Sequence, residues 1–193
     1  REDQDQRRQT QMAFINDIDG ILRGYETDRN VLLEKRDRVE PSGYRSRAAL
    51  EAMRAEHAEK VDAELARLLD GTREKLAATL DGYVSSLASR YTKTPETIDA
   101  ADLALLTSGV SLSAQDVEAM YGRCRSDAMR EVVAAYEAEH QTGADVTFFS
   151  QDVRAEAARS YTATARDAVG NPDGLKFAML LDGKAVPAAL AGE

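Results

Sequence analysis

The sequence has little of what several common protein classes depend on. Its 193 residues include one cysteine, Cys124, so it has no internal disulfide, and this suits a reducing compartment such as the cytoplasm. It has no tryptophan, four phenylalanines and four prolines, so its core must consist mainly of Ala, Leu and Val. No apolar run approaches the roughly 20 residues of a membrane-spanning helix. The polar opening REDQDQRRQTQ is not expected to be a secretory signal.

Basic charge is also in the minority. The chain has 25 Lys and Arg against 34 Asp and Glu, a formal net charge of −9. A protein whose main task is to bind nucleic acid needs a basic surface to neutralise phosphates, so this composition argues against that role. Abundant alanine and 31% charged residues favour helix instead, and we expect an all-α fold.

A first long helix is predicted from apolar positions that repeat every three and four residues. Gly20 and Gly24 lie inside it, where plain tolerance of glycine is the simpler explanation and close approach of another backbone is the alternative. Pro41-Ser42-Gly43 predicts a turn after it. Residues 1–11 precede Met12, which resembles a natural start; they are a processed segment, an added one or a polar lead-in. The repeat consists of Ile15, Ile18, Leu22, Tyr25, Arg29, Leu32, Arg36 and Val39.

A second helix of about 48 residues is predicted from Tyr44 to Tyr91, roughly 70 Å long. Its apolar stripe has a mean spacing of about 3.7 residues, so it cannot match the first helix as a regular two-stranded coiled coil throughout. We therefore expect a coiled-coil-like antiparallel hairpin, with a second copy of the chain or the C-terminal helices covering the rest. The interface expected for a homo-oligomer is Leu50, Met53, His57, Val61, Leu65, Leu68, Leu76 and Leu80, and the stripe also includes Thr72, Tyr83, Leu87 and Tyr91.

The C-terminal half is predicted to consist of shorter helices with recognisable caps. Thr97 or Asp99 caps a helix that Ser108-Gly109 ends, Ser113 caps the next with Asp116 in a capping box, and Ser126 opens a third that Thr142-Gly143 closes. A fourth, from Gln151 to Val169, has Val153, Ala157, Tyr161 and Ala165 at four-residue steps, and this alanine-rich face is expected to pack close to another helix. A turn at 170–174 follows. In the tail 175–190, a hairpin at Asp182-Gly183 competes with a short helix from Leu175 to Leu181, which the helical context favours.

These elements suggest three parts: a long helical hairpin at 1–92, a small three-helix module at 93–143, and a C-terminal helix and tail at 144–193.

Residues with catalytic or metal-binding chemistry are few. Glu137 and His140 form a Glu-x-x-His pair, but a di-iron bundle needs a second copy, and His57 has Arg54 where the glutamate should stand. His57 instead fits a position on the apolar seam. Cys124 lies between two arginines, which would lower its thiol pKa, but no histidine is placed to act as its base. We therefore expect no catalytic residue, no metal and no cofactor.

Basic residues gather modestly on both sides of the predicted turn. They would make the hairpin tip locally positive, a docking point for an acidic protein surface or a nucleic-acid backbone. The simpler interpretation is a solvated turn whose basic residues are balanced by Asp and Glu. The group consists of Arg23, Arg29, Lys35, Arg36, Arg38, Arg45, Arg47 and Arg54.

Residues Thr97–Glu137 resemble small helical bacteriophage proteins encoded among head and morphogenesis genes. The shared pattern is Leu-Leu-x-Ser-Gly at 105–109, a capped helix ending in Ala-Met at 119–120, and a further Ala-Met helix around 128–129. Such proteins have a long coiled segment and mostly no assigned activity. The resemblance implies a structural, scaffold-like role in a phage or prophage, with a capsid or other structural protein as partner and a location in the host cytoplasm or virion.

Taken together, the sequence predicts a non-enzymatic structural or assembly protein that associates with itself through helices. The alternative is a host adaptor or regulatory coiled-coil module that binds a protein partner through the hairpin tip.

Overall fold

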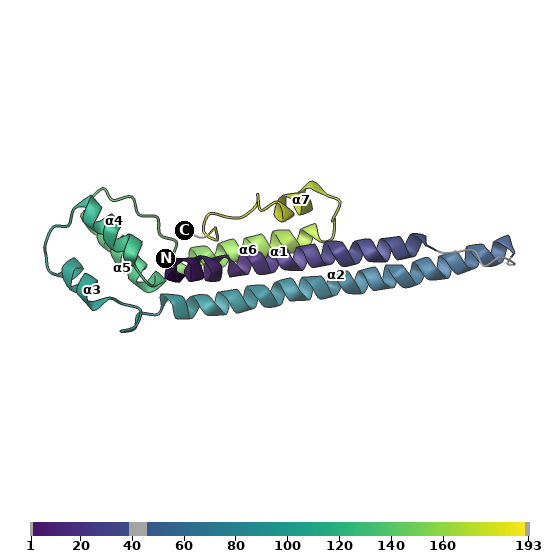
Figure 1. The fold of residues 1–193 in the computed structure, drawn as a ribbon, viewed down its shortest axis with the longest axis horizontal. Helices are drawn as coiled ribbons and strands as arrows, with labels where there is room; N and C mark the ends of the chain where they lie inside the picture. The colour runs from purple at the N-terminus through teal and green to yellow at the C-terminus, as the bar shows by residue number, and fades with distance from the viewer. Residues whose placement is uncertain (1, 39–45, 192–193) are drawn as a thin grey trace. The chain divides into compact units, whose positions relative to one another are not determined.

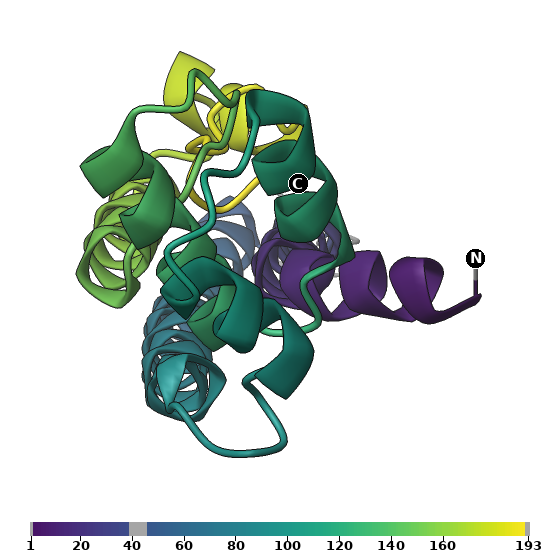
Figure 2. The ribbon, with the colours of Figure 1, turned by 90° about the vertical axis from the view of Figure 1, so that its left-hand side faces the viewer.

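The computed structural model describes residues 2–38 and 46–191, a range that contains seven helices and no strand (Figure 1; turned by 90° in Figure 2). The chain is therefore an all-α protein, as predicted. The helices are α1 (Glu2–Asp37), α2 (Arg47–Tyr91), α3 (Ala100–Thr107), α4 (Ala114–Arg123), α5 (Asp127–His140), α6 (Gln151–Ala168) and α7 (Leu175–Leu181).

Contacts divide the chain into two units. Unit 1 comprises Arg1–Asp81 and Ala158–Glu193, and unit 2 comprises Gly82–Ala157. The division predicted from sequence, after residues 92 and 143, falls elsewhere. The difference arises because α2 and α6 each continue unbroken from one unit into the other, so the breaks in helical pattern do not mark the unit boundaries.

In unit 1, α1 and α2 form an antiparallel pair (Figure 1). The Lys35 ammonium lies 3.0 Å from the Glu64 carboxylate, and Arg36 lies 3.5 Å from Asp62. The predicted repeat of α1 is buried at its start, at Ile15, Ile18, Leu22 and Tyr25, and becomes half-buried at Leu32 and exposed at Arg36. Val39 and the predicted turn at residues 41–43 lie outside the described residues.

The C-terminal helices cover part of this pair within unit 1. The Tyr25 hydroxyl donates to the carbonyl of Val169 at 2.9 Å, and its ring meets Phe177 of α7 edge-on, with 6.2 Å between centroids. Arg23 donates to the carbonyl of Leu181 at 2.7 Å, and Arg29 pairs with Asp173 at 2.9 Å. The helix predicted over Leu175–Leu181 is therefore present as α7, and it packs on α1.

The inner face of α6 differs from the predicted one. Val153 is 48% exposed, so its placement on the buried line was wrong, whereas Tyr161 and Ala165 are buried as expected. A strict four-residue step turns 40° per step around an α-helix, so a line drawn that way leaves the buried face after a few turns. The buried face consists of Arg154, Ala155, Ala158, Tyr161, Thr162, Ala165 and Ala168.

Unit 2 is organised by the predicted caps. The Asp99 carboxylate accepts from two backbone N–H groups at the start of α3, Ser113 and Asp116 form a capping box on α4, and the Ser126 hydroxyl accepts from Met129 N at 3.0 Å. These caps fix where α3, α4 and α5 begin and so bring their apolar faces together. The resulting core contains Leu106, Val117, Met120, Cys124, Met129, Val133 and Tyr136.

A second cluster in unit 2 joins the end of α2 to the segment before α6. Leu87, Tyr91 and Ala155 are buried against Tyr83, Val84 and Phe148. The Tyr91 hydroxyl donates to the carbonyl of Phe149 at 2.6 Å, and burial raises the pKa of Tyr91 to about 12. The segment between α5 and α6 is irregular but tied to α4, because Tyr121 donates to the carbonyl of Thr147 at 2.6 Å.

Candidate functional site

The stripe predicted as an oligomer interface is partly used inside the chain. Val61 is 1% exposed and Leu76 is 0% exposed, so neither side chain offers surface to a partner. The remaining members of the predicted interface are half-buried. They are Leu50, Met53, His57, Leu65, Leu68 and Leu80.

The stretch nearest the hairpin tip is the least covered part of unit 1. We call residues 30–38, which comprise the end of α1 and the residue after it, together with residues 47–66 of α2, the distal arm. In Figure 1, α6 and α7 lie alongside other stretches of the pair, and α2 continues past the end of α1, so among the described residues of unit 1 each helix of the arm has at most the other beside it. Leu32, Leu50 and Met53 are half-buried there. The arm therefore keeps apolar surface that the other described residues of unit 1 do not fully cover.

His57 has a structural partner within the arm. Its Nε2 lies 2.9 Å from the carbonyl oxygen of Lys35. A carbonyl oxygen only accepts, so Nε2 carries the proton and donates. This contact across the two helices explains how a polar ring is accommodated on an apolar stripe, as the sequence predicted for a seam residue.

Most of the basic group around the tip is balanced by acidic side chains. Beyond the cross-helix pairs of Lys35 and Arg36, Arg38 pairs with Glu34 at 3.2 Å and Arg47 with Glu51 at 3.0 Å, while Arg45 lies outside the described residues. These contacts favour the interpretation as a solvated, charge-balanced surface. Exposed pairs of this kind contribute roughly 0–1 kcal/mol each.

A groove of about 450 Å³ runs between α1 and α2 in unit 1. No described atom outside the helix's own backbone and the adjacent residues lies within 4 Å of the place that a Cβ would occupy at Gly20 or Gly24, so no backbone from another described segment approaches them. Both glycines are solvent-exposed, and half-buried Ile21 and Leu68 supply apolar surface between charged rims. The lining residues are Asn16, Asp17, Gly20, Ile21, Gly24, Tyr25, Asp28, Leu68, Thr72, Lys75 and Thr79.

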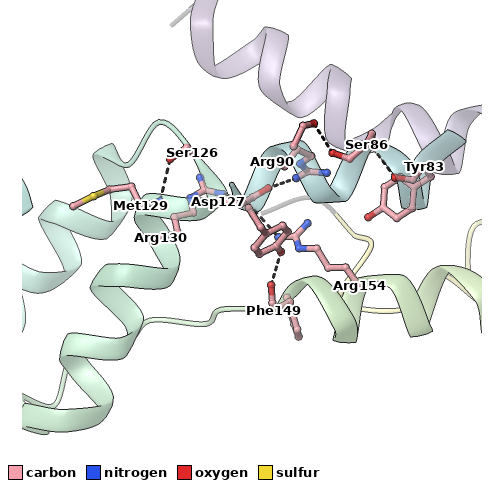
Figure 3. Close-up of polar contacts among 11 residues, drawn as sticks. Tyr83, Ser86, Arg90, Ser126, Asp127, Met129, Arg130, Phe149 and Arg154 are labelled. Carbon is pink, nitrogen blue, oxygen red and sulfur yellow. Dashed lines mark hydrogen bonds and ion pairs between the residues drawn. The ribbon is translucent and has the colours of Figure 1, made fainter. Parts of the chain in front are cut away.

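Unit 2 contains a buried ionic cluster centred on Asp127 (Figure 3). The Asp127 carboxylate lies 2.5 Å from Arg90, 3.8 Å from Arg130 and 3.9 Å from Arg154, and its side chain is only 5% exposed. The three guanidinium groups come from α2, α5 and α6, so one carboxylate ties three helices together. The sequence analysis missed this cluster, because its members are separated by up to 64 positions and only Asp127 and Arg130 show a helical spacing.

The environment of Cys124 is the opposite of the one predicted. Its pKa is raised to about 11 because burial disfavours the thiolate, and this outweighs the neighbouring arginines. The thiol donates to the carbonyl of Met120 at 3.2 Å and packs in the unit 2 core. The predicted lowering of its pKa was therefore wrong: adjacency in sequence to Arg123 and Arg125 did not anticipate desolvation by α3 and α5.

Glu137 and His140 each contact groups at the end of α5. Glu137 accepts hydrogen bonds from the Thr142 hydroxyl and, at 3.0 Å, from Gly143 N, and these bonds lower its pKa. The His140 ring stacks on Tyr136 with 3.9 Å between centroids, and its Nδ1 lies 3.0 Å from the Tyr136 carbonyl oxygen. Both residues therefore stabilise the local turn. Within residues 2–38 and 46–191, no three His, Cys, Asp or Glu side chains gather closely enough to hold a metal ion.

Comparison with protein-family models, curated proteins and solved structures gives no match. Across the described ranges, no helix combines the length and apolar character that crossing a bilayer requires. The geometry therefore defines two candidate sites of interaction in unit 1: the distal arm and the groove.

Proposed function

We propose that this chain is a non-enzymatic structural or assembly protein that acts by associating through its helices. The observation that carries the proposal is the distal arm, where Leu32, Leu50 and Met53 remain half-buried and neither α6 nor α7 lies alongside. A helix with at most one neighbouring helix is covered on only one side, so apolar surface remains and packing with further helices buries it.

The charges of the arm are compatible with such packing. Most of its Lys and Arg residues pair with Glu and Asp of the same arm, as in Lys35–Glu64 and Arg36–Asp62, so no large surplus of one sign opposes close approach of another helical surface. A role in phage or prophage morphogenesis, with a capsid or other structural protein as partner, is the finer form of this proposal. It rests on the resemblance of residues 97–137.

The first experiment is light scattering coupled to size exclusion over a wide concentration series. Self-association predicts a mass that rises with concentration to at least twice that of one chain. A substitution of half-buried Met53 by glutamate should reduce the association, whereas Arg54→Glu, at the exposed neighbouring position, serves as the control. A chain that stays monomeric at every concentration contradicts the proposal.

The alternative is a monomeric adaptor. The burial of Val61 and Leu76 favours it, because this burial interrupts the apolar stripe of α2 and leaves the arm as a limited docking surface, rather than an interface along the whole helix. In that case the monomer would bind a different protein, and the same Met53→Glu change would abolish binding of that partner without altering the mass of the chain.

A further inference from the structure

We infer that the groove between α1 and α2 is the surface on which a second copy of this chain docks, with α1 of each copy lying over α2 of the other. This inference rests on the self-association proposed above and names the surface and geometry through which it occurs. The groove is lined only by residues of unit 1, so the argument depends on unit 1 alone.

The shape of the groove suits another helix. Gly20 and Gly24 lie four residues apart on α1, and the space above both is open. Because glycine has no side chain, nothing at these two positions keeps a partner helix away. Ile21 and Leu68 offer half-buried apolar surface beside the two glycines. Val31 extends the same face of α1 two turns further and is 60% exposed, the kind of large apolar group that a docked helix would cover.

The size of the face is close to that of a weak dimer interface. From Asn16 to Asp37 the groove and the adjoining part of the distal arm span about 33 Å at 1.5 Å per residue, and two helices are about 20 Å wide. The resulting area, roughly 650 Å² per copy, approaches the roughly 800 Å² per partner of a standard interface. We therefore expect association in the micromolar range or weaker.

The charges on the two rims are self-complementary and select one arrangement. Asp17 and Asp28 lie on the α1 rim, and Lys75 lies on the α2 rim. The Lys35–Glu64 pair gives the register of the two antiparallel helices. Eleven residues after Glu64 on α2 is Lys75, and eleven residues before Lys35 on α1 is Gly24, so Lys75 lies opposite Gly24. This level is between those of Asp17 and Asp28. A two-fold axis parallel to the helices puts α1 of one copy over α2 of the other, so that Lys75 of each copy approaches the aspartates of its mate.

The alternative two-fold arrangement is disfavoured by the same charges. An axis perpendicular to the helices would place α1 over α1, and the aspartates of one copy would then face those of the other. Like charges across an interface are repulsive, and this repulsion excludes wrong registers more strongly than opposite charges add affinity. Both arrangements make every neighbouring helix pair antiparallel, as in a four-helix bundle, so the charges are what distinguish them.

The test compares dissociation constants of full-length variants by sedimentation equilibrium. Gly20→Gln with Gly24→Gln fills the groove without a clash inside the chain, and should raise the dissociation constant about tenfold or more. Gly122→Gln in α4 is the matched control, because its position is equally open and it belongs to unit 2. Circular dichroism should show all three chains folded, since glutamine is a better helix former than glycine.

A charge exchange tests the arrangement itself. Lys75→Glu alone should weaken association, and Asp17→Lys with Asp28→Lys in the same chain should restore it. If the wild type associates but the glutamine pair leaves the dissociation constant unchanged, the groove is not the interface, while the proposed function stands. If the charge exchange fails to restore association, the α1-over-α2 arrangement is overturned. A wild type that never associates overturns both the inference and the proposed function.

Discussion

Replacing Asp127 with asparagine should destabilise unit 2 by about 3 kcal/mol or more. Asp127 is almost fully buried, and its carboxylate faces guanidinium groups of Arg90, Arg130 and Arg154. Asparagine keeps the shape but removes the negative charge, so the guanidinium groups lose the buried charge that they share. Removing one partner of a buried ion pair costs roughly 3–5 kcal/mol, because the remaining charge stays desolvated without compensation.

The expected change is large enough to measure by thermal and urea unfolding. For a chain of this length a loss of about 3 kcal/mol lowers the thermal midpoint by roughly 6–12 °C. Glu64→Gln is the matched control: its pair with Lys35 has side chains 42% and 52% exposed, and breaking it should cost less than about 1 kcal/mol. Hydrogen exchange should show the loss of protection in α5. If Asp127→Asn costs no more than Glu64→Gln, the reasoning about the buried cluster is refuted.

Three further predictions concern a thiol, a hydroxyl and a set of carboxylates. A pKa of about 11 for Cys124, against its ordinary 9.0, lowers the thiolate fraction at neutral pH about 100-fold. A thiol reagent should therefore label the folded chain far more slowly than the denatured chain. Equal labelling rates would show that the thiol is not buried. Thr162 is 1% exposed, and among the described residues its hydroxyl has no hydrogen-bond partner. Thr162→Val should therefore stabilise the protein by about 1 kcal/mol, whereas Thr72→Val, which loses a bond to the Leu68 carbonyl, should not. Hydrogen bonds lower the folded-state pKa of three carboxylates, so the stability that these carboxylates contribute is present at neutral pH and is lost as the pH falls below about 4. The thermal midpoint should therefore drop below that pH, and it should drop less steeply in Asp116→Asn. A thermal midpoint that does not change with pH would contradict this prediction. The three are Asp99, Asp116 and Glu137.

Features contained within a few neighbouring residues were predictable from the sequence. The caps at Asp99, Ser113 and Ser126 are confirmed, because a cap depends on a side chain and backbone N–H groups two or three positions away. The long second helix is confirmed as well, and it begins at Arg47 rather than Tyr44 among the described residues. The short helix at the tail is also present, and there Phe177 and Leu180 are buried.

Features that depend on distant residues were not predictable in the same way. The apolar stripe of the second helix shows that a cover is needed, but a second copy and the C-terminal helices fit the pattern equally well. The cluster at Asp127 and the raised pKa of Cys124 both depend on which helices meet. The neighbouring residues gave no sign of the cluster, and for Cys124 they predicted a lowered pKa instead of a raised one. For the same reason the groove could not be predicted: the sequence shows two glycines four apart, but not whether another helix covers them.

The division of the chain into units has a consequence for the order of its synthesis and folding. Unit 2 is one unbroken stretch, residues 82–157, whereas unit 1 is assembled from residues before and after it. A ribosome therefore completes unit 2 before it has made α7 and the part of α6 that belongs to unit 1. Domains generally fold as units during synthesis, so the α1–α2 pair must wait, with Tyr25 and its neighbours uncovered, until the part of unit 1 that follows residue 157 has emerged. The helix pair is made before unit 2 but is completed after it.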